Sequence, residues 1–489
     1  MDENVFSNLK IVLKDLGSIL IILGVLMLAL IIVPGIFKEF YVLNVLLLVA
    51  VVTLSSGIVL RFSCRDAKEP ELKHAMITAA LAWLVVPAFS SLFFVFIEGM
   101  SPLDSLFEAI SGWTGTGLTM IAHPSSLTHT IQFWRSLMQW VGGAGVIVLM
   151  VTILARPGTG AFLLYKAEAR EGKIRPSVVS TVRIIWWIYL LLTSIGIVLF
   201  YLAGMSPWEA INHAMTALGT GGFSITDNSM ASYNNPLIEL TIIPMMILGA
   251  IPFLVHYKVL KGNVRVFFKD MQCRALFIIL LLLLIPLFVE NYVSSYSTIS
   301  DTLRFSSFQL ISGLTCTGFQ TTDVHLWPGT ALGIVCIAML IGGGAGSTAG
   351  GIKLIRIVIV VKEVSWSLMK AFLPKRAVKP FRFGERLLDE EQMNRIISEA
   401  DLIIILWILF LFLGVGVLSH VVAPQYTLTE VIFEVASAQG NVGLSTGITN
   451  AGLSCIGKVM LILNMWIGRL EIIPVLMLFR AFVKGFEPI

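Results

Sequence analysis

The stretch SGWTGTGLTM (residues 111–120) separates two long apolar runs and contains three glycines and three threonines. Glycine in a helix interior costs about 1 kcal/mol relative to alanine, and threonine is also a weak helix former. The flanking runs have the length and composition of membrane helices. The sequence therefore predicts that the chain loses its helical structure here, at membrane depth.

Apolar runs long enough to cross a bilayer recur along the whole chain. Of the 489 residues, 56% are hydrophobic and 13% are charged, and about 20 apolar residues cross the hydrocarbon core. Ten runs are predicted to span the membrane: 16–37, 41–60, 76–97, 136–155, 184–204, 236–255, 276–293, 329–343, 402–418 and 453–479. The first run follows several charged residues and lacks a small-residue cleavage site, so we expect it to be a retained helix.

Lysine and arginine gather in alternate loops. The basic connections are 61–73, 156–183, 258–274 and 353–395. Because cytoplasmic loops carry the excess of positive charge, this pattern predicts a multi-pass protein of the cytoplasmic membrane with both termini cytoplasmic. Acidic residues outnumber bases in the other loops, where they would concentrate cations. They are Glu98, Asp104, Glu108, Glu209, Asp227, Glu290, Asp301, Asp323, Glu430 and Glu434.

Neither an enzyme nor a nucleotide-binding domain is favoured. The seven histidines are dispersed, without an HExxH motif, so no catalytic constellation is visible. The five cysteines form no CxxC pair, which argues against a disulfide framework or a zinc site. The segment GAGSTA (344–349) fits the GxGxxG/A pattern but lacks a βαβ context, and no P-loop sequence is present.

The glycine-rich stretch occurs four times. The copies are ISGWTGTGLT (110–119), MTALGTGGFS (215–224), ISGLTCTGFQ (311–320) and ASAQGNVGLS (436–445). They share one glycine, at positions 117, 222, 318 and 443, and each follows a short helix-like segment, at 103–113, 207–218, 302–314 and 427–438. These segments are too short to span. The sequence predicts an all-α polytopic membrane protein, with two N-terminal transmembrane helices and then four tandem helix–pore-loop–helix repeats around a pseudo-fourfold pore.

Irregular backbone at membrane depth is tolerated where protein buries it or where it lines a water-filled path. Four converging loops would satisfy both conditions, and their carbonyl oxygens could replace the water shell of a cation. Glycine permits the torsions that turn carbonyl groups toward the axis. The short helices would point their partially negative C-terminal ends at the pore.

The arrangement resembles the Trk/Ktr/HKT superfamily of potassium transporters, most closely the TrkH-type potassium uptake pore subunit. Four further stretches carry the resemblance: QWVGGAGVIVL (139–149), LLYKAEAREGKIRP (163–176), GGGAGSTAGGIKLIR (342–356) and MWIGRLEIIPVL (465–476). The resemblance covers nearly the whole chain. It implies potassium uptake, with K⁺ as the transported ion, no covalent cofactor and no enzymatic activity.

The resemblance also implies which residues form a selectivity filter and bind K⁺. They are Thr114, Gly115, Thr116, Gly117, Gly219, Thr220, Gly221, Gly222, Thr315, Cys316, Thr317, Gly318, Gly440, Asn441, Val442 and Gly443. Asn441 and Val442 replace the threonine- or cysteine-containing sequence of the other copies, so we expect a potassium preference that is less strict than in tetrameric channels. Some relatives with serine at the first filter glycine admit sodium, and Gly117 favours potassium.

The resemblance implies a gate as well, formed by an intramembrane loop and the pore arginine Arg469. The loop residues are Gly342, Gly343, Gly344, Ala345, Gly346, Ser347, Thr348, Ala349, Gly350 and Gly351. Tight helix packing would instead place glycine at every fourth position. Two alternatives remain for the charged residues of the last helix: Arg469 forms a structural ion pair with a carboxylate, and Lys458 snorkels to the surface.

These assignments divide the chain into six parts. They are 1–70 (two N-terminal helices), 71–160, 161–260 and 261–365 (repeats 1 to 3, the third with the gating loop), 366–395 (cytoplasmic linker) and 396–489 (repeat 4). The resemblance implies a homodimer, a cytosolic nucleotide-binding regulatory subunit of the TrkA type, contact with membrane lipid and no nucleic-acid partner. A less selective K⁺/Na⁺ channel and an ion-coupled K⁺ symporter remain open.

Overall fold

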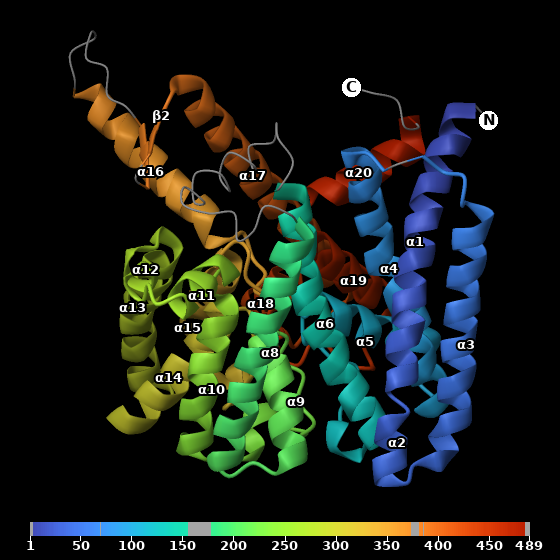
Figure 1. The fold of residues 1–489 in the computed structure, drawn as a ribbon. Helices are drawn as coiled ribbons and strands as arrows, with labels where there is room; N and C mark the ends of the chain where they lie inside the picture. The colour runs from blue at the N-terminus through green and yellow to red at the C-terminus, as the bar shows by residue number, and fades with distance from the viewer. Residues whose placement is uncertain (1–2, 69, 155–177, 373–380, 385, 485–489) are drawn as a thin grey trace.

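Helices make up almost all of the described structure. The computed structural model describes residues 3–68, 70–154, 178–372, 381–384 and 386–484. The motif at 163–176 lies outside these residues, as do parts of the basic loops at 156–183 and 353–395. Both chain termini lie at the same end of the molecule (Figure 1), as an even number of membrane passes requires.

Two helices precede the repeats, as predicted. They are α1 (Glu3–Ala29), which continues into the short α2 (Ile32–Phe37), and α3 (Phe40–Ser63). The pair packs closely where Gly17 of α1 meets Gly57 of α3, since a Cβ on Gly57 would lie 2.8 Å from the Gly17 carbonyl oxygen. Small residues allow this approach between membrane helices, where packing rather than the hydrophobic effect drives association.

Each repeat begins with a long helix and continues into a short one. The bounds in repeats 1 and 2 are α4 (Leu72–Ile97), α5 (Pro102–Thr114), η1 (Pro124–Ser126), α6 (His129–Leu154), α8 (Val178–Leu202), α9 (Pro207–Leu218), η2 (Ser229–Ser232), α10 (Pro236–Ala250), α11 (Phe253–Leu260) and α12 (Arg265–Lys269). Those in repeats 3 and 4 are α13 (Met271–Ser294), α14 (Ile299–Leu314), η3 (Val324–Leu326), α15 (Gly329–Ile341), α16 (Leu354–Ala371), α17 (Glu390–Val421), α18 (Leu428–Gly440), α19 (Cys455–Arg469) and α20 (Ile473–Lys484).

The four short helices, α5, α9, α14 and α18, start with the same capping arrangement. Side chains of Ser101, Ser206, Thr298 and Thr427 accept a hydrogen bond from the backbone N–H three residues later. The residue that donates this N–H is Asp104, Glu209, Asp301 or Glu430. This S/T-x-x-D/E signature places a carboxylate at the positive end of each helix. The signature occurs before all four short helices, so it marks where each of them starts in the sequence.

The prediction of ten continuous spans is wrong. Among the described residues, six helices are long and apolar enough to cross a membrane, or eight if each of two bent pairs counts as one span. The run at 236–255 bends by 105° between α10 and α11, where Pro252 lacks an N–H, and the run at 453–479 bends by 112° between α19 and α20. The run at 329–343 is the 13-residue helix α15.

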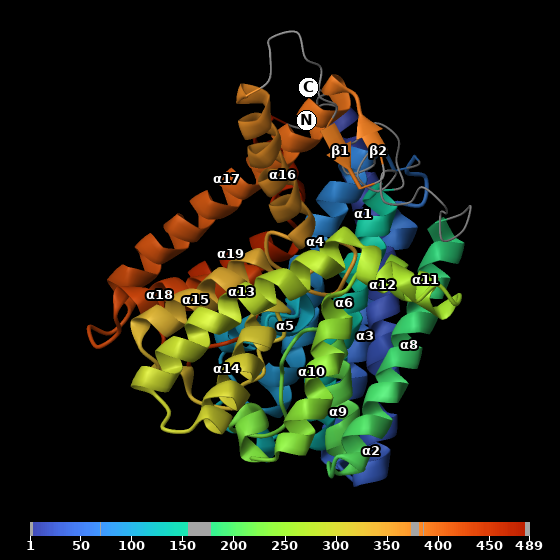
Figure 2. The same cartoon turned by 90° about the vertical axis from the view of Figure 1, so that its left-hand side faces the viewer.

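A small antiparallel hairpin was not anticipated. Strands β1 (Phe381–Phe383) and β2 (Arg386–Leu388) pair between α16 and α17. Figure 2 shows this hairpin beside α16, at the end of the molecule that carries both termini. Phe381 and Phe383 are buried in a small core with Ile359 and Ile396, so the hairpin packs against both neighbouring helices.

We expect Gly57→Leu to lower the melting temperature of the purified protein in detergent. The new side chain would collide with α1, and overpacking of a close contact costs about 1–3 kcal/mol. Gly416→Leu is the matched control, because Gly416 lies on an exposed face of α17 and a Cβ there meets no atom within 4 Å. Equal melting temperatures for the two variants would show that the α1–α3 contact is not tight.

Candidate ion-conduction site

The four glycine-containing loops adopt the same backbone conformation. Left-handed torsions occur at two positions in each loop, separated by one residue. The first position is Gly115 (φ 65°), Thr220 (48°), Cys316 (55°) or Asn441 (53°), and the second is Gly117 (90°), Gly222 (72°), Gly318 (85°) or Gly443 (99°). Glycine takes such torsions without steric cost. Thr220, Cys316 and Asn441 adopt them although they carry side chains, so the surrounding structure holds the backbone there.

The shared glycines form a closed ring, named here the glycine ring: Gly117, Gly222, Gly318 and Gly443. A Cβ built on Gly117 would lie 2.2 Å from the carbonyl oxygen of Gly221 in repeat 2, and one on Gly222 would lie 2.0 Å from that of Thr317 in repeat 3. A Cβ on Gly318 would meet the Val442 oxygen at 2.0 Å, and one on Gly443 the Thr116 oxygen at 2.3 Å. The contacts run from repeat 1 through 2, 3 and 4 back to 1.

Backbone amides in the loops bond inward, to the ends of the short helices. The N–H groups of Thr116, Gly221, Thr317 and Val442 each donate to the carbonyl oxygen five residues earlier, at 2.9 Å in all four repeats. The preceding amide donates to the carbonyl oxygen three residues before it. These bonds satisfy the donors without using the loop carbonyls. The carbonyl oxygens of Thr116, Thr317 and Val442 accept no hydrogen bond from the described residues, and that of Gly221 accepts one from Gln139 Nε2 at 2.6 Å.

A buried side chain nine residues before each ring glycine forms hydrogen bonds with the chain segment that follows that glycine. In repeats 1 and 4 it is a glutamate. Glu108 accepts from Thr119 Oγ1 at 2.9 Å and from the Met120 amide at 3.0 Å, and Glu434 accepts from Ser445 Oγ at 2.8 Å and from the Thr446 amide at 3.0 Å. His213 Nε2 lies 2.9 Å from Ser224 Oγ, and Gln309 Nε2 donates to Thr321 Oγ1 at 3.4 Å. These four side chains, Glu108, His213, Gln309 and Glu434, are called the clamps here. They occupy equivalent positions in the four repeats but differ in chemical type.

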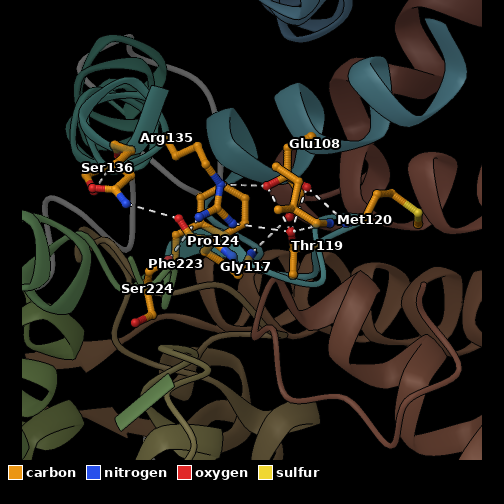
Figure 3. Close-up of polar contacts among 12 residues, drawn as sticks. Glu108, Gly117, Thr119, Met120, Pro124, Arg135, Ser136, Phe223 and Ser224 are labelled. Atoms are coloured by element: carbon orange, nitrogen blue, oxygen red, sulfur yellow. Dashed lines mark hydrogen bonds and ion pairs between the residues drawn. The ribbon is translucent and has the colours of Figure 1, made fainter. Parts of the chain in front are cut away.

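A cavity of about 480 Å³ opens on one side of the glycine ring and is called the vestibule here. All four ring glycines line it, together with Thr119, Arg135, Ser224, Asp227, Asp323 and Ser445. Figure 3 shows Arg135, which lines the vestibule, beside Glu108, Thr119 and Phe223. A hydrogen bond from the Ser125 amide holds the pKa of Asp227 below its ordinary value, so that carboxylate is ionised at neutral pH.

The glycine-rich loop at 342–351 lies against the other side of the four loops. Thr348 is its central contact: its hydroxyl donates to the carbonyl oxygens of Leu218 at 3.0 Å and Gly249 at 2.8 Å, and accepts from Thr220 Oγ1 at 3.1 Å. A Cβ on Gly350 would lie 2.1 Å from the Gly440 carbonyl oxygen. Because of these approaches, the loop packs directly beneath repeats 2 and 4.

Arg469 is buried beneath the loops, and its hydrogen-bond partners among the described residues are carbonyl oxygens. Its Nη1 donates to Thr348 at 2.9 Å and its Nη2 to Gly142 at 3.1 Å, while its Nε has no partner among the described residues. The nearby carboxylate of Glu471 pairs with Arg356 instead. The alternative of a structural ion pair between Arg469 and a carboxylate is therefore not what the structure shows. With buried Lys353, which donates to the Ala349 carbonyl oxygen, the region is rich in positive charge.

A sequence profile described as TrkH, cation transport protein, matches residues 43–484. The chain belongs to the TrkH family. It is therefore a multi-pass membrane transport protein, and the alternative of an integral-membrane enzyme is set aside.

Individual relatives agree with this assignment of the TrkH-family chain. It is 37% identical to an uncharacterized cation transporter of Methanocaldococcus jannaschii, over 96% of this chain and 95% of the relative. It is 31% identical to the Trk system potassium uptake protein TrkH of Salmonella typhimurium, over 88% and 89% of the two chains. The crystal structure of the potassium transporter TrkH from Vibrio parahaemolyticus superposes with a TM-score of 0.84 at 28% identity, covering 96% of this chain and 98% of that one.

The structure brings the sequence-predicted residues together and adds others. Contacts between neighbouring repeats join the four loops that contain the sixteen predicted filter residues, and residues 342–351 and Arg469 lie next to these loops. The sequence contains no sign of Gln139 as a functional residue or of the contacts of Arg135, and the expectation that Glu108 and Glu434 attract cations in outer loops is wrong, because both are fully buried. A search at a fixed offset from each ring glycine would have found Glu108 and Glu434, since both lie nine residues earlier.

The alternative that Lys458 snorkels to the surface is wrong. Its Nζ lies 2.5 Å from Asp104 Oδ1 and donates to the Ala451 carbonyl oxygen at 2.8 Å. Both side chains are largely buried. The pair joins α19 of repeat 4 to the start of α5 in repeat 1, and so closes the circle of repeats.

We expect Asp104→Asn to destabilise the protein by about 2 kcal/mol, because it leaves a largely buried ammonium without its carboxylate. Thermal unfolding in detergent measures this. Asp301→Asn is the control, since the Asp301 carboxylate bonds Thr298 at an exposed helix start. A loss no greater than that of the control would contradict the role of the pair.

Proposed function

We propose that this chain takes up K⁺ across the cytoplasmic membrane through the glycine ring. The observation that carries the proposal is the closed cycle of contacts between each ring glycine and the next repeat's carbonyl oxygen. Such a cycle encloses an axis around which loop carbonyl groups are gathered, and carbonyl oxygens replace the hydration shell of a permeating cation. Relatives across most of the chain are named potassium uptake proteins.

The distribution of lysine and arginine indicates which side of the chain faces the cytoplasm. Loops rich in lysine and arginine face the cytoplasm, and α16 and the start of α17 carry Lys362, Lys370 and Arg395 at the end where both termini lie. The vestibule then faces outward and the loop at 342–351 faces inward. Asp227 and Asp323 in the vestibule wall would attract cations toward the ring, and the four short helices would direct their negative ends at an ion within it.

The loop at 342–351 and Arg469 form the gate in this proposal. The loop is held on the axis by Thr348, which bonds repeat 2 and Arg469 simultaneously. A buried guanidinium without a carboxylate partner repels a cation about 5 Å away by roughly 3 kcal/mol at an effective dielectric constant of 20. Conduction then requires that the loop leave its site and that Arg469 lose its contact with Thr348.

Regulation would come through partner proteins. We propose a homodimer whose protomers each hold one pore, with a cytosolic nucleotide-binding subunit of the TrkA type docking at the end that carries α16 and the β1–β2 hairpin. The relatives named as part of a Trk system support a multi-subunit arrangement. Anionic lipid would contact the basic residues at the same end.

We expect Gly117→Ser to reduce the preference for K⁺ over Na⁺ by about tenfold, equivalent to ~1.4 kcal/mol of differential binding. A Cβ at this position would displace the Gly221 carbonyl oxygen, which lies 2.2 Å away. Uptake of radiolabelled Rb⁺ into proteoliposomes, in competition with Na⁺ and Li⁺, measures the preference. Gly416→Ser, on an exposed face of α17, is the control. Unchanged selectivity in the folded Gly117 variant would overturn the filter assignment.

We expect Arg469→Ala to raise Rb⁺ flux several-fold, because it removes both the positive barrier and a bond that holds the loop. Flux is normalised to the amount of folded protein in the vesicles. Arg61→Ala, which removes an arginine that bonds Ser18 near the surface, should leave flux unchanged. Equal or lower flux in folded Arg469→Ala would count against the barrier.

A further inference from the structure

Arg135 of α6 is a fully buried arginine in the vestibule wall that the proposed filter and gate do not use. Its guanidinium donates to three acceptors from two repeats: Glu108 Oε1 at 2.8 Å, Thr119 Oγ1 at 3.2 Å and the Ser224 carbonyl oxygen at 2.9 Å. It also lies over the ring of Phe223, 4.1 Å from the centroid. Figure 3 shows these groups around a single side chain.

We propose that Arg135 is a specificity-determining residue, which sets the preference for K⁺ by fixing the ring segments of repeats 1 and 2 relative to each other. The inference rests on the proposed filter. Thr119 and Ser224 are each two residues beyond a ring glycine, Gly117 and Gly222. Arg135 therefore holds together the segments that follow Gly117 and Gly222. These two segments meet at the contact between repeats 1 and 2, which is called a seam here.

The seam between repeats 3 and 4 has a related bond made by a neutral side chain. Gln320, two residues beyond Gly318, donates from Nε2 to the Ser445 carbonyl oxygen at 3.2 Å. Ser445 is two residues beyond Gly443, as Ser224 is beyond Gly222. Equivalent carbonyl groups are thus held across both seams, by an arginine in one and by a glutamine in the other.

An arginine at the seam between repeats 1 and 2 can bond more acceptors than a neutral side chain can. Its planar fork of donors reaches three acceptors in fixed directions, which neither lysine nor glutamine can reproduce. The cost is a buried charge, which Glu108 compensates. The clamp in repeat 4, Glu434, accepts bonds from Ser445, Thr446 and Thr449 and from no arginine in the described part of the chain. A buried glutamate at this position therefore does not require an arginine, and we assign the purpose of Arg135 to its link with Ser224.

A shift of the repeat 2 segment relative to repeat 1 would change the positions of carbonyl groups in the glycine ring. The Gly221 carbonyl oxygen faces Gly117 across this seam. Gln139, one turn further along α6, holds the segment just before Arg135's contact, donating to Gly221 and accepting from the Phe223 amide at 2.9 Å. Without Arg135, this segment keeps its bonds to Gln139 but loses the bond from the Ser224 carbonyl oxygen to the guanidinium that also holds Thr119 and Glu108, so the positions of Thr119 and Ser224 relative to each other are no longer fixed.

The test compares four variants in the same Rb⁺ competition assay: Arg135→Gln, Arg135→Lys, Glu108→Gln and the double variant Glu108→Gln/Arg135→Gln. We expect Arg135→Gln to reduce the preference for K⁺ over Na⁺ about tenfold, and Arg135→Lys to reduce it less. Glu108→Gln should reduce the preference less than Arg135→Gln does, because its amide oxygen still accepts from Arg135 although its amide nitrogen cannot accept from the Met120 amide. The double variant should regain thermal stability relative to Arg135→Gln and still lack selectivity.

Arg304→Gln is the matched control. Arg304 makes a two-bond pair with Glu239, at 2.6 and 2.7 Å, between α14 and α10, and it does not line the vestibule. It should lower stability and leave selectivity unchanged. Wild-type selectivity in the double variant would overturn the inference, because Arg135 would then only neutralise Glu108. If Gly117→Ser alters selectivity and folded Arg135→Gln does not, the filter stands and this inference fails; if Gly117→Ser has no effect, the proposed function itself fails.

Discussion

The structure depends on one constraint: a chain that leaves its helix at membrane depth must satisfy its backbone donors within the protein. Each loop meets this requirement in the same way. Two successive amides turn back to the carbonyl oxygens three and five residues earlier, at the end of the preceding short helix. That geometry uses left-handed torsions at alternate positions. It leaves carbonyl groups available, and only glycine fits at the second of these positions because the neighbouring repeat lies so close.

Backbone symmetry and side-chain symmetry differ around the ring. The backbone repeats fourfold, but hydroxyl pairs occur only in repeats 1 and 3, where Thr114 Oγ1 lies 2.7 Å from Thr116 Oγ1 and Thr315 Oγ1 lies 2.8 Å from Thr317 Oγ1. Repeats 2 and 4 carry glycine or valine there. The carbonyl group two residues beyond a ring glycine accepts a side-chain bond from the preceding repeat in repeats 2 and 4, from Arg135 and Gln320. The ring is therefore approximately twofold in its chemistry, which permits unequal ion environments along one path.

Glycines let the second helix of three repeats pack closely against the short helix, on the side of the ring away from the vestibule. Gly142, Gly249 and Gly468 each lie under the last turn of a short helix, where a Cβ would come within 2.1, 2.6 and 1.8 Å of a carbonyl oxygen. In repeat 1 the second helix makes this approach at Gly142 and continues as α6 to Leu154. The second helix does not continue in this way in the other repeats. In repeats 2 and 4 it bends, at Pro252 and after Arg469, and in repeat 3 it unwinds into the loop that Thr348 anchors. The two helix bends, the loop at 342–351 and the buried side chains of Lys353 and Arg469 therefore lie on the same side of the glycine ring.

The sequence by itself determined the repeats, the short helices to within a few residues and the ring glycines, because hydropathy, capping residues and glycine spacing are local signals. Tertiary structure alone decided the bends, the left-handed torsions of Thr220, Cys316 and Asn441, and the partners of Arg135, Lys458 and Arg469. Those features depend on contacts between residues far apart in the chain, as when Asn441 Nδ2 of repeat 4 donates to Thr116 Oγ1 of the neighbouring repeat 1 at 3.0 Å. No local pattern specifies such a partner, because its position is fixed only when all four repeats pack together.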